Sequence, residues 1–69
     1  MTWLTTYSGG DPDGRVNLAH VERMFVQLAS SLHLVRVRTQ SGSEYWVSLG
    51  LPTEAEALAK LDDLILNGA

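Results

Sequence analysis

The segment from Leu32 to Gly50, LHLVRVRTQSGSEYWVSLG, constrains the fold more than any other part of the chain. Val35 and Val37 alternate with arginines before a polar loop, and Tyr45 and Val47 continue the alternation after it. In a β-strand, a period of two places one set of side chains on each face. The segment therefore predicts a β-hairpin with an apolar inner face.

The loop of this hairpin is expected at Gln40-Ser41-Gly42, where Gly42 can take the left-handed backbone conformation at little cost. Such a loop fixes the register of the two strands. The inner face is predicted to pair Val37 with Tyr45 and Val35 with Val47, and the outer face Arg38 with Glu44 and Arg36 with Trp46. The alternation extends to Ser48 outward and Leu49 inward.

The C-terminal part of the chain predicts an α-helix. Pro52 precedes a capping box of Thr53 and Glu56, in which each side chain satisfies a free amide at the helix start. The residues Asn67-Gly68 are typical of a helix stop, and Glu56 is placed to pair with Lys60. The expected apolar stripe is Leu58, Leu61 and Ile65, widened by Ala57 and Leu64. We expect it to pack on Val35, Val37, Val47 and Leu49, with Leu51 near the helix start.

The N-terminal part predicts a strand from Trp3 to Tyr7, with Trp3, Thr5 and Tyr7 on one face and Leu4 and Thr6 on the other. The next segment, Ser8 to Gly14, holds three glycines, two aspartates and a proline, which is typical of a turn or mobile loop. Its DPDG sequence also resembles part of a calcium loop, but the further oxygen ligands are missing. A short strand, Arg15 to Leu18, is expected next, with Val16 and Leu18 inward.

Residues 18–32 fit two structures. Met24, Val26 and Leu28 alternate with Arg23, Phe25 and Gln27, which is a strand pattern with an unusually apolar outer face. The same stretch places apolar residues near a 3.6-residue period, with Asn17 as a possible helix cap. We favour the strand, from Val21 to Leu28, followed by a connection at Ala29-Ser30-Ser31.

These elements predict an α+β fold in a single domain, residues 1–69. The expected architecture is an antiparallel β-meander of four to five strands with one C-terminal α-helix packed on one face. A chain of 69 residues buries only about 60% of its unfolded surface, so its stability is marginal. The chain has no cysteine to supply disulfides. Domains of this size are often stabilised by association, and we therefore expect a homodimer.

The composition bears on function and location. The net charge of −3 argues against non-specific binding of nucleic acid. The first residues lack both a basic start and an apolar run, so no signal peptide is expected. No apolar stretch approaches the roughly 20 residues that span a bilayer. We expect a cytoplasmic protein with no membrane association.

No set of residues predicts catalysis. Ser30-Ser31-His33 places a histidine near serines in sequence, but neighbouring side chains of a strand point to opposite faces. His20 is isolated, and Asp62 and Asp63 do not face one another on a helix. We expect no enzyme activity, no catalytic residues, no cofactor and no metal site.

The outer face of the hairpin is the candidate contact surface. Arg36 can stack on Trp46, and Arg38 can form an ion pair with Glu44. Trp and Arg are enriched among the residues that dominate protein interfaces. The candidate partner-binding residues are Trp46, Arg36, Arg38, Phe25 and Trp3. We predict a small interaction or regulatory module that associates with itself or with a protein partner. The alternative is sequence-specific nucleic-acid binding through Arg23, Arg36 and Arg38.

The segment from Val16 to Ile65 carries two resemblances. A short strand ending in VNL, a strand with Glu22, a hairpin with Ser41-Gly42 at its tip and a capped helix resemble the small flagellar and swarming-motility proteins. The chain differs from them in the strand at Trp3–Tyr7 and in lacking a lysine-rich tail. The same order is similar to the LytTR-type DNA-binding domain, a β-rich module that contacts DNA through its loops. These resemblances imply a role in motility or in DNA binding, respectively.

Overall fold

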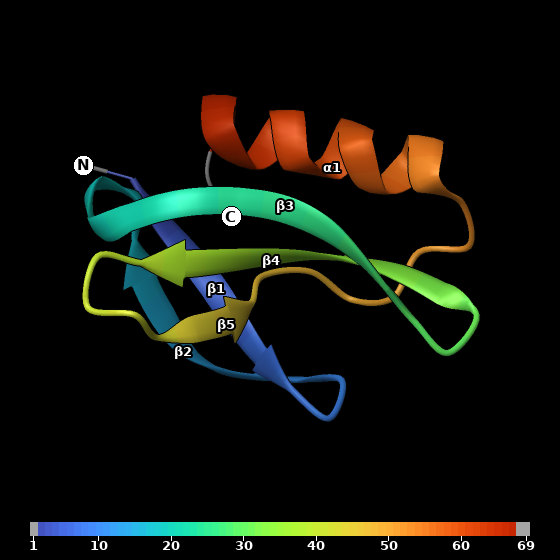
Figure 1. Cartoon of the computed structure of the whole chain (residues 1–69), viewed down its shortest axis with the longest axis horizontal. Coiled ribbons are helices and arrows are strands. Elements are labelled where there is room, and N and C mark those ends of the chain that lie inside the picture. Colours follow the sequence, from blue (N-terminus) through green and yellow to red (C-terminus); the bar gives the residue numbers. More distant parts are fainter. Residues whose placement is uncertain (1, 68–69) are drawn as a thin grey trace.

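Five antiparallel strands form one sheet, and a single α-helix packs on it (Figure 1). The computed structural model describes residues 2–67. The strands are β1 (Trp3–Ser8), β2 (Asp11–Asn17), β3 (Val21–Ala29), β4 (Leu32–Thr39) and β5 (Glu44–Trp46). A 3-10 turn, η1 (Leu18–His20), joins β2 to β3, and the helix α1 is Glu54–Asn67. The predicted α+β fold, with its helix on one face of an antiparallel sheet, is confirmed.

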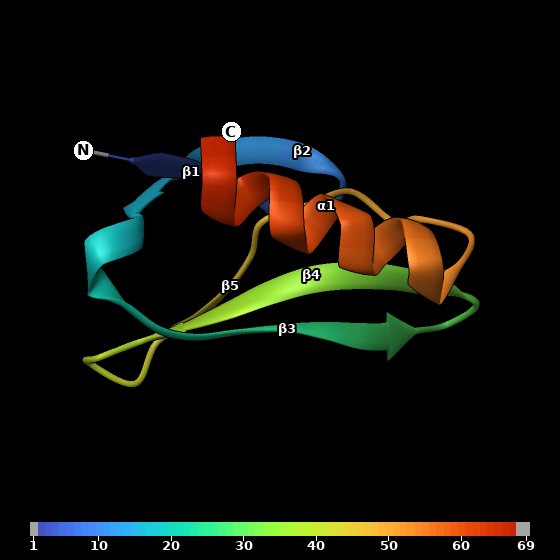
Figure 2. The ribbon, with the colours of Figure 1, turned by 90° about the horizontal axis from the view of Figure 1, so that it is seen from above.

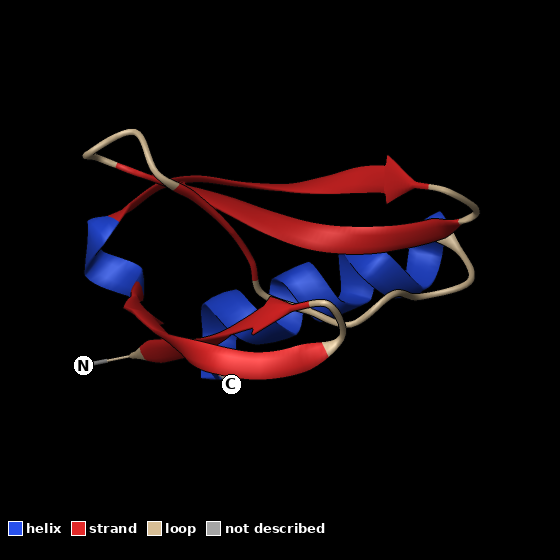
Figure 3. Cartoon of the chain, turned by 90° about the horizontal axis from the view of Figure 1, so that it is seen from below, coloured by secondary structure: helices blue, strands red, loops and turns tan. Residues whose placement is uncertain are grey.

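The strand order is β2-β1-β5-β4-β3. The meander β3-β4-β5 is therefore joined to the hairpin β1-β2 where β5 pairs with β1, and the register pair there is Tyr7 with Trp46. Figures 2 and 3 show β1 and β2 on one side of the molecule and β3 and β4 on the other, with α1 running between them. The helix thus covers the concave side of a strongly curved sheet. The core between them contains Leu4, Val16, Val35, Val37, Val47 and Leu64.

The loop predicted at Ser8–Gly14 is wrong in extent, because β2 already begins at Asp11. Gly9 and Gly10 have φ angles of 59° and 88° and form the turn by themselves. The Thr6 hydroxyl donates a 2.6 Å hydrogen bond to Asp13, close to an irregularity in the β1–β2 register. Pro12 is tolerated here because β2 is an edge strand.

The strand predicted to end at Leu18 ends one residue earlier, at Asn17. Asn17 caps η1, since its side-chain oxygen accepts a 2.9 Å hydrogen bond from the amide of Ala19. The strand interpretation of the following segment is confirmed by β3, which pairs with β4 as far as Ala29 opposite Leu32. A tight turn at Ser30-Ser31, with Ser30 at a φ of 58°, makes this pairing possible.

The hairpin β4–β5 has the predicted register, with Val37 opposite Tyr45, Arg38 opposite Glu44 and Arg36 opposite Trp46. Gly42 has the expected positive φ, 92°. The Val47 amide donates a 2.9 Å hydrogen bond to the Val35 carbonyl, which extends the register by one residue.

Two predicted orientations in this hairpin are wrong. Ser48 is buried, and its hydroxyl oxygen accepts a 2.8 Å hydrogen bond from the amide of Val35. The chain therefore leaves the ladder after Val47, and this departure turns Leu49 out to solvent instead of into the core. Tyr45, the middle residue of β5, is 40% exposed although its partner Val37 is buried.

The helix begins as predicted, and the amide of Glu56 donates a 3.2 Å hydrogen bond to the Thr53 hydroxyl. The return bond of the predicted capping box, from the Thr53 amide to the Glu56 carboxylate, is not found within residues 2–67. The predicted stripe is wrong in its rotation, because Leu58 and Ile65 are 47% and 49% exposed. Leu61 packs against the core as predicted, and Ala57 and Leu64, which are predicted to widen the stripe, are its buried members, at positions i, i+4 and i+7.

Three smaller predictions concern the same end of the chain. Leu51 pairs with His33 just before the helix, near the place expected for it. Within residues 2–67, the predicted ion pair of Glu56 with Lys60 is not formed. The ion pair that is found there joins Arg36 to Glu44. The predicted stop at Gly68 lies outside the described residues.

Candidate interaction surfaces

The outer face of the sheet carries an aromatic and cationic row, which we call the outer row. Phe25 on β3 lies opposite Arg36 on β4, Arg36 lies opposite Trp46 on β5, and Trp46 lies opposite Tyr7 on β1. Directly opposed residues in antiparallel strands point to the same face. The pairing therefore brings together side chains from four strands, including three of the predicted contact residues.

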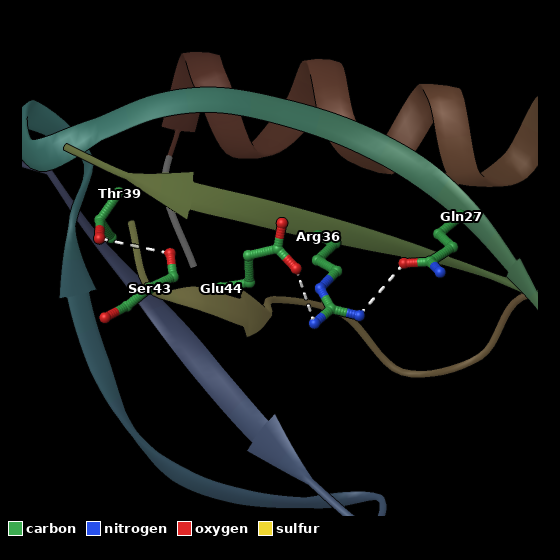
Figure 4. A network of polar contacts seen from close by, with 5 residues as sticks. All are labelled: Gln27, Arg36, Thr39, Ser43 and Glu44. Atoms are coloured by element: carbon green, nitrogen blue, oxygen red, sulfur yellow. Dashed lines mark hydrogen bonds and ion pairs between the residues drawn. The ribbon is translucent and has the colours of Figure 1, made fainter. Parts of the chain in front are cut away.

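Arg36 lies between Phe25 and Trp46 in this row. Figure 4 shows its polar contacts with Glu44 and Gln27. The Arg36 guanidinium lies 4.4 Å from the centre of the Trp46 ring, forms a 3.0 Å ion pair with Glu44 and donates a 3.2 Å hydrogen bond to Gln27. Its Nε is buried and has no hydrogen-bond partner within residues 2–67. The predicted Arg36–Trp46 stacking is confirmed, whereas the ion pair predicted for Arg38 with Glu44 is formed by Arg36. Both terminal nitrogens of Arg36 thus make a contact within its own sheet.

The other predicted contact residues are placed differently. Arg38 is exposed in the adjacent row, between Arg23 and Glu44. The Arg23 guanidinium lies 5.0 Å from the centre of the Phe25 ring. Trp3 is 45% exposed at the beginning of β1, opposite Asn17, and lies four residues along the strand from Tyr7. Trp3 is therefore not part of the outer row.

The structure reveals a second surface along β3 and α1. A groove of about 560 Å³ lies between them. Its apolar lining includes Met24, Val26 and Leu28 from β3 and Leu58 and Leu61 from α1, and the predicted contact residue Phe25, His33 and Glu54 also line it. Leu28 is 61% exposed and Leu58 is 47% exposed. We call this feature the β3 groove. It is an exposed apolar surface on a domain whose core is small.

Sequence reasoning missed the β3 groove. The uncharged run from Met24 to Leu28, MFVQL, is the one local signal that could have indicated it. The groove also depends on β3 being the last strand of the sheet and on the rotation of α1. Neither property follows from a pattern within one element.

The described residues contain little that indicates catalysis. Among residues 2–67, no group of three or more histidines, aspartates and glutamates is placed to hold a metal ion. A smaller hollow of about 330 Å³ includes His20, Ser41 and Tyr45, and no carboxylate lines it. Within the described part of the chain, no helix is both long and apolar enough to cross a membrane.

Comparisons of the chain with protein-family models, with curated proteins and with solved structures gave no match. The two resemblances noted in the sequence therefore stay predictions.

Proposed function

We propose that this protein is a small non-enzymatic interaction module of the cytoplasm that associates with itself. The observation that carries the proposal is the β3 groove, where leucines from a strand and a helix remain exposed side by side. Removing apolar surface from water is favourable by about 25 cal/mol per Å². A partner that covers the groove therefore also stabilises a fold with few buried side chains.

The outer row supports the same proposal in a different way. The contacts of Arg36 with Trp46, Glu44 and Gln27 link β4 to both of its neighbouring strands, β5 and β3. Phe25, which belongs to the outer row, lies on β3 opposite Arg36. The remaining predicted contact residues, Arg38 and Trp3, are exposed and stay candidates for a further protein contact.

The competing proposal, nucleic-acid binding through Arg23, Arg36 and Arg38, finds less support. Arg36 is engaged by Glu44 and Trp46, and the net charge of the chain is −3. Phosphate binding needs cations that are free to neutralise the backbone. A titration of labelled duplex DNA at low salt separates the two proposals, because only the nucleic-acid module gives binding that weakens steeply as salt is added.

Sedimentation equilibrium tests self-association directly. Over a concentration range from about 1 μM to 1 mM, the mass should rise from 7.6 kDa toward twice that value. Leu28→Lys should keep the chain at 7.6 kDa, because it places a charge in the groove at a residue that is already 61% exposed. Leu49→Lys is the matched control, since Leu49 is 50% exposed and lies outside the groove. A wild-type chain that stays at 7.6 kDa throughout contradicts the proposal.

A further inference from the structure

We infer that the partner is a second copy of this chain, paired antiparallel along the open edge of β3 about a two-fold axis at Val26. The inference rests on the self-association proposed above and adds the strand, its direction and its register. It follows from three properties of β3: the lack of protection along its edge, the direction of its backbone groups and the symmetry of its side chains.

The two edges of the sheet differ in how they are protected. One edge is β2, which carries Asp11, Pro12, Asp13 and Gly14 and pairs irregularly with β1. The other edge is β3, whose central residues, Met24 to Leu28, include no charged residue, proline or glycine. Charges, prolines and bulges are what keep a sheet edge from accepting another strand. The first residues of β3 carry Glu22, Arg23 and a register shift, but the run from Met24 to Leu28 has none of these features. This run is therefore the part of the two edges best suited to strand addition.

The hydrogen bonds of β4 show which groups of β3 point outward. His33 exchanges two 2.8 Å hydrogen bonds with Leu51, on the side of β4 away from β3. The Val35 amide and carbonyl are likewise used on that side, by Ser48 and Val47. Neither residue therefore bonds to its register partner on β3.

In an antiparallel pair of strands, hydrogen-bonded residue pairs alternate with pairs that share no hydrogen bond. In a pair without a hydrogen bond, the amide and carbonyl of each residue point away from the other strand. Leu28 is opposite His33 and Val26 is opposite Val35. The amides and carbonyls of Leu28 and Val26 therefore point to the open edge. Those of Met24 do the same, because Met24 is two residues before Val26 in a regular ladder.

These three outward residues are symmetric about Val26. In an antiparallel pair with its two-fold axis there, Val26 lies opposite Val26 of the second copy, and Met24 lies opposite Leu28 of the second copy. Every outward amide and carbonyl of the three residues then gains a partner. A surface without matching backbone groups would instead leave these amides and carbonyls buried without a hydrogen-bond partner, which is unfavourable.

The side chains match in the same register. The pairs of Val26 with Val26 and of Met24 with Leu28 are apolar and lie on the face that continues into the β3 groove. On the outer face, Phe25 lies opposite Gln27, so no charge is placed against another charge. An axis at Phe25 would instead put the Glu22 carboxylate opposite Leu28 at the apolar face, which is costly. The self-complementarity of this run favours a second copy over a strand of another protein.

Cysteine cross-linking tests the register, because the natural chain has no thiol. Val26→Cys should form covalent dimers by itself under mild oxidation, since the paired Cα atoms would be about 5.5 Å apart. Phe25→Cys mixed with Gln27→Cys should form mixed dimers, whereas Phe25→Cys alone should not. The control is Ser41→Cys in the exposed β4–β5 loop, over which Val26→Cys should give about tenfold more dimer.

Proline substitution tests the direction of the backbone groups. Val26→Pro removes only an outward amide, so the monomer should fold while dimerisation weakens at least about tenfold. Gln27→Pro removes an amide that bonds to β4 and should lose the fold. If Val26→Pro does not fold, Leu28→Lys supplies a folded chain that should not dimerise.

The outcomes separate this inference from the proposed function. A wild-type chain that is monomeric at all concentrations overturns both. A dimer in which Val26→Cys forms no more covalent dimer than Ser41→Cys overturns the inference alone. Cross-linking of Phe25→Cys by itself, without Val26→Cys, overturns the register. Dimerisation of folded Val26→Pro at wild-type strength overturns the β3 interface.

Discussion

The rotation of α1 gives the most quantitative test of the fold. Leu64 is fully buried against the sheet, and the adjacent Ile65 is 49% exposed. Truncation of a fully buried leucine to alanine costs about 2–5 kcal/mol, because it removes transfer free energy and leaves a cavity. At Ile65 the half-exposed side chain contributes roughly 1 kcal/mol, and the higher helix propensity of alanine offsets part of that loss.

We therefore expect Leu64→Ala to lower the free energy of unfolding by about 3 kcal/mol and Ile65→Ala by less than about 1 kcal/mol. A domain of this size has a total free energy of unfolding of roughly 3–10 kcal/mol, so the loss expected for Leu64→Ala is a large share of it. Urea unfolding followed by tryptophan fluorescence measures both, at concentrations low enough to keep the chain monomeric. Equal losses, or a larger loss for Ile65→Ala, would refute the rotation described here.

Three further substitutions probe single contacts, each measured by urea unfolding. Ser48→Ala should cost about 1–3 kcal/mol, because it leaves the buried amide of Val35 without its acceptor; a loss below about 0.5 kcal/mol would contradict this. Gly50→Ala should destabilise by about 1–3 kcal/mol, since the new Cβ would lie 2.6 Å from Leu32 Cδ1 and 3.1 Å from its Cβ; unchanged stability would show that Leu32 moves aside freely. Thr53→Ala should cost about 1 kcal/mol through loss of the helix cap, and Thr53→Ser should be close to neutral; similar losses for both would exclude the cap.

The hairpin shows what could be predicted from the sequence. Its register depends on a local loop and on an alternation that both lie within one segment, and the pairing of Arg36 with Trp46 follows from them. The capped start of α1 is local in the same sense, since it depends on Thr53 and on residues within one turn of it. Such features need no knowledge of the rest of the molecule.

The features that sequence reasoning missed depend on several elements at once. The rotation of α1 depends on how the helix packs on the sheet, which buries Ala57 and Leu64 and leaves Leu58 and Ile65 exposed. The Ser48 hydroxyl is buried and accepts the hydrogen bond of the Val35 amide, where a regular strand would offer a backbone carbonyl. A pattern of alternating residues does not indicate such a bond. The β3 groove is exposed because β3 is the last strand of the sheet. This position depends on the pairing of β5 with β1, two strands that are far apart in the sequence.

The candidate surface was predicted in part. Phe25, Arg36 and Trp46 do lie together on the outer face, because cross-strand neighbours follow from the register. The register does not show that Gln27 and Glu44 each contact a terminal nitrogen of the Arg36 guanidinium, so that this arginine is already engaged within the sheet. The apolar groove on the other face is the better supported contact surface.

Amide hydrogen exchange along β3, measured in dilute and in concentrated solution, tests the pairing of two β3 strands most directly. If two copies pair at this edge, the amides of Met24, Val26 and Leu28 should exchange rapidly in dilute solution and become protected as the concentration rises. The amides of Phe25 and Gln27, which bond to β4, should be protected at both concentrations. Exchange at Met24, Val26 and Leu28 that does not depend on concentration would contradict pairing at this edge.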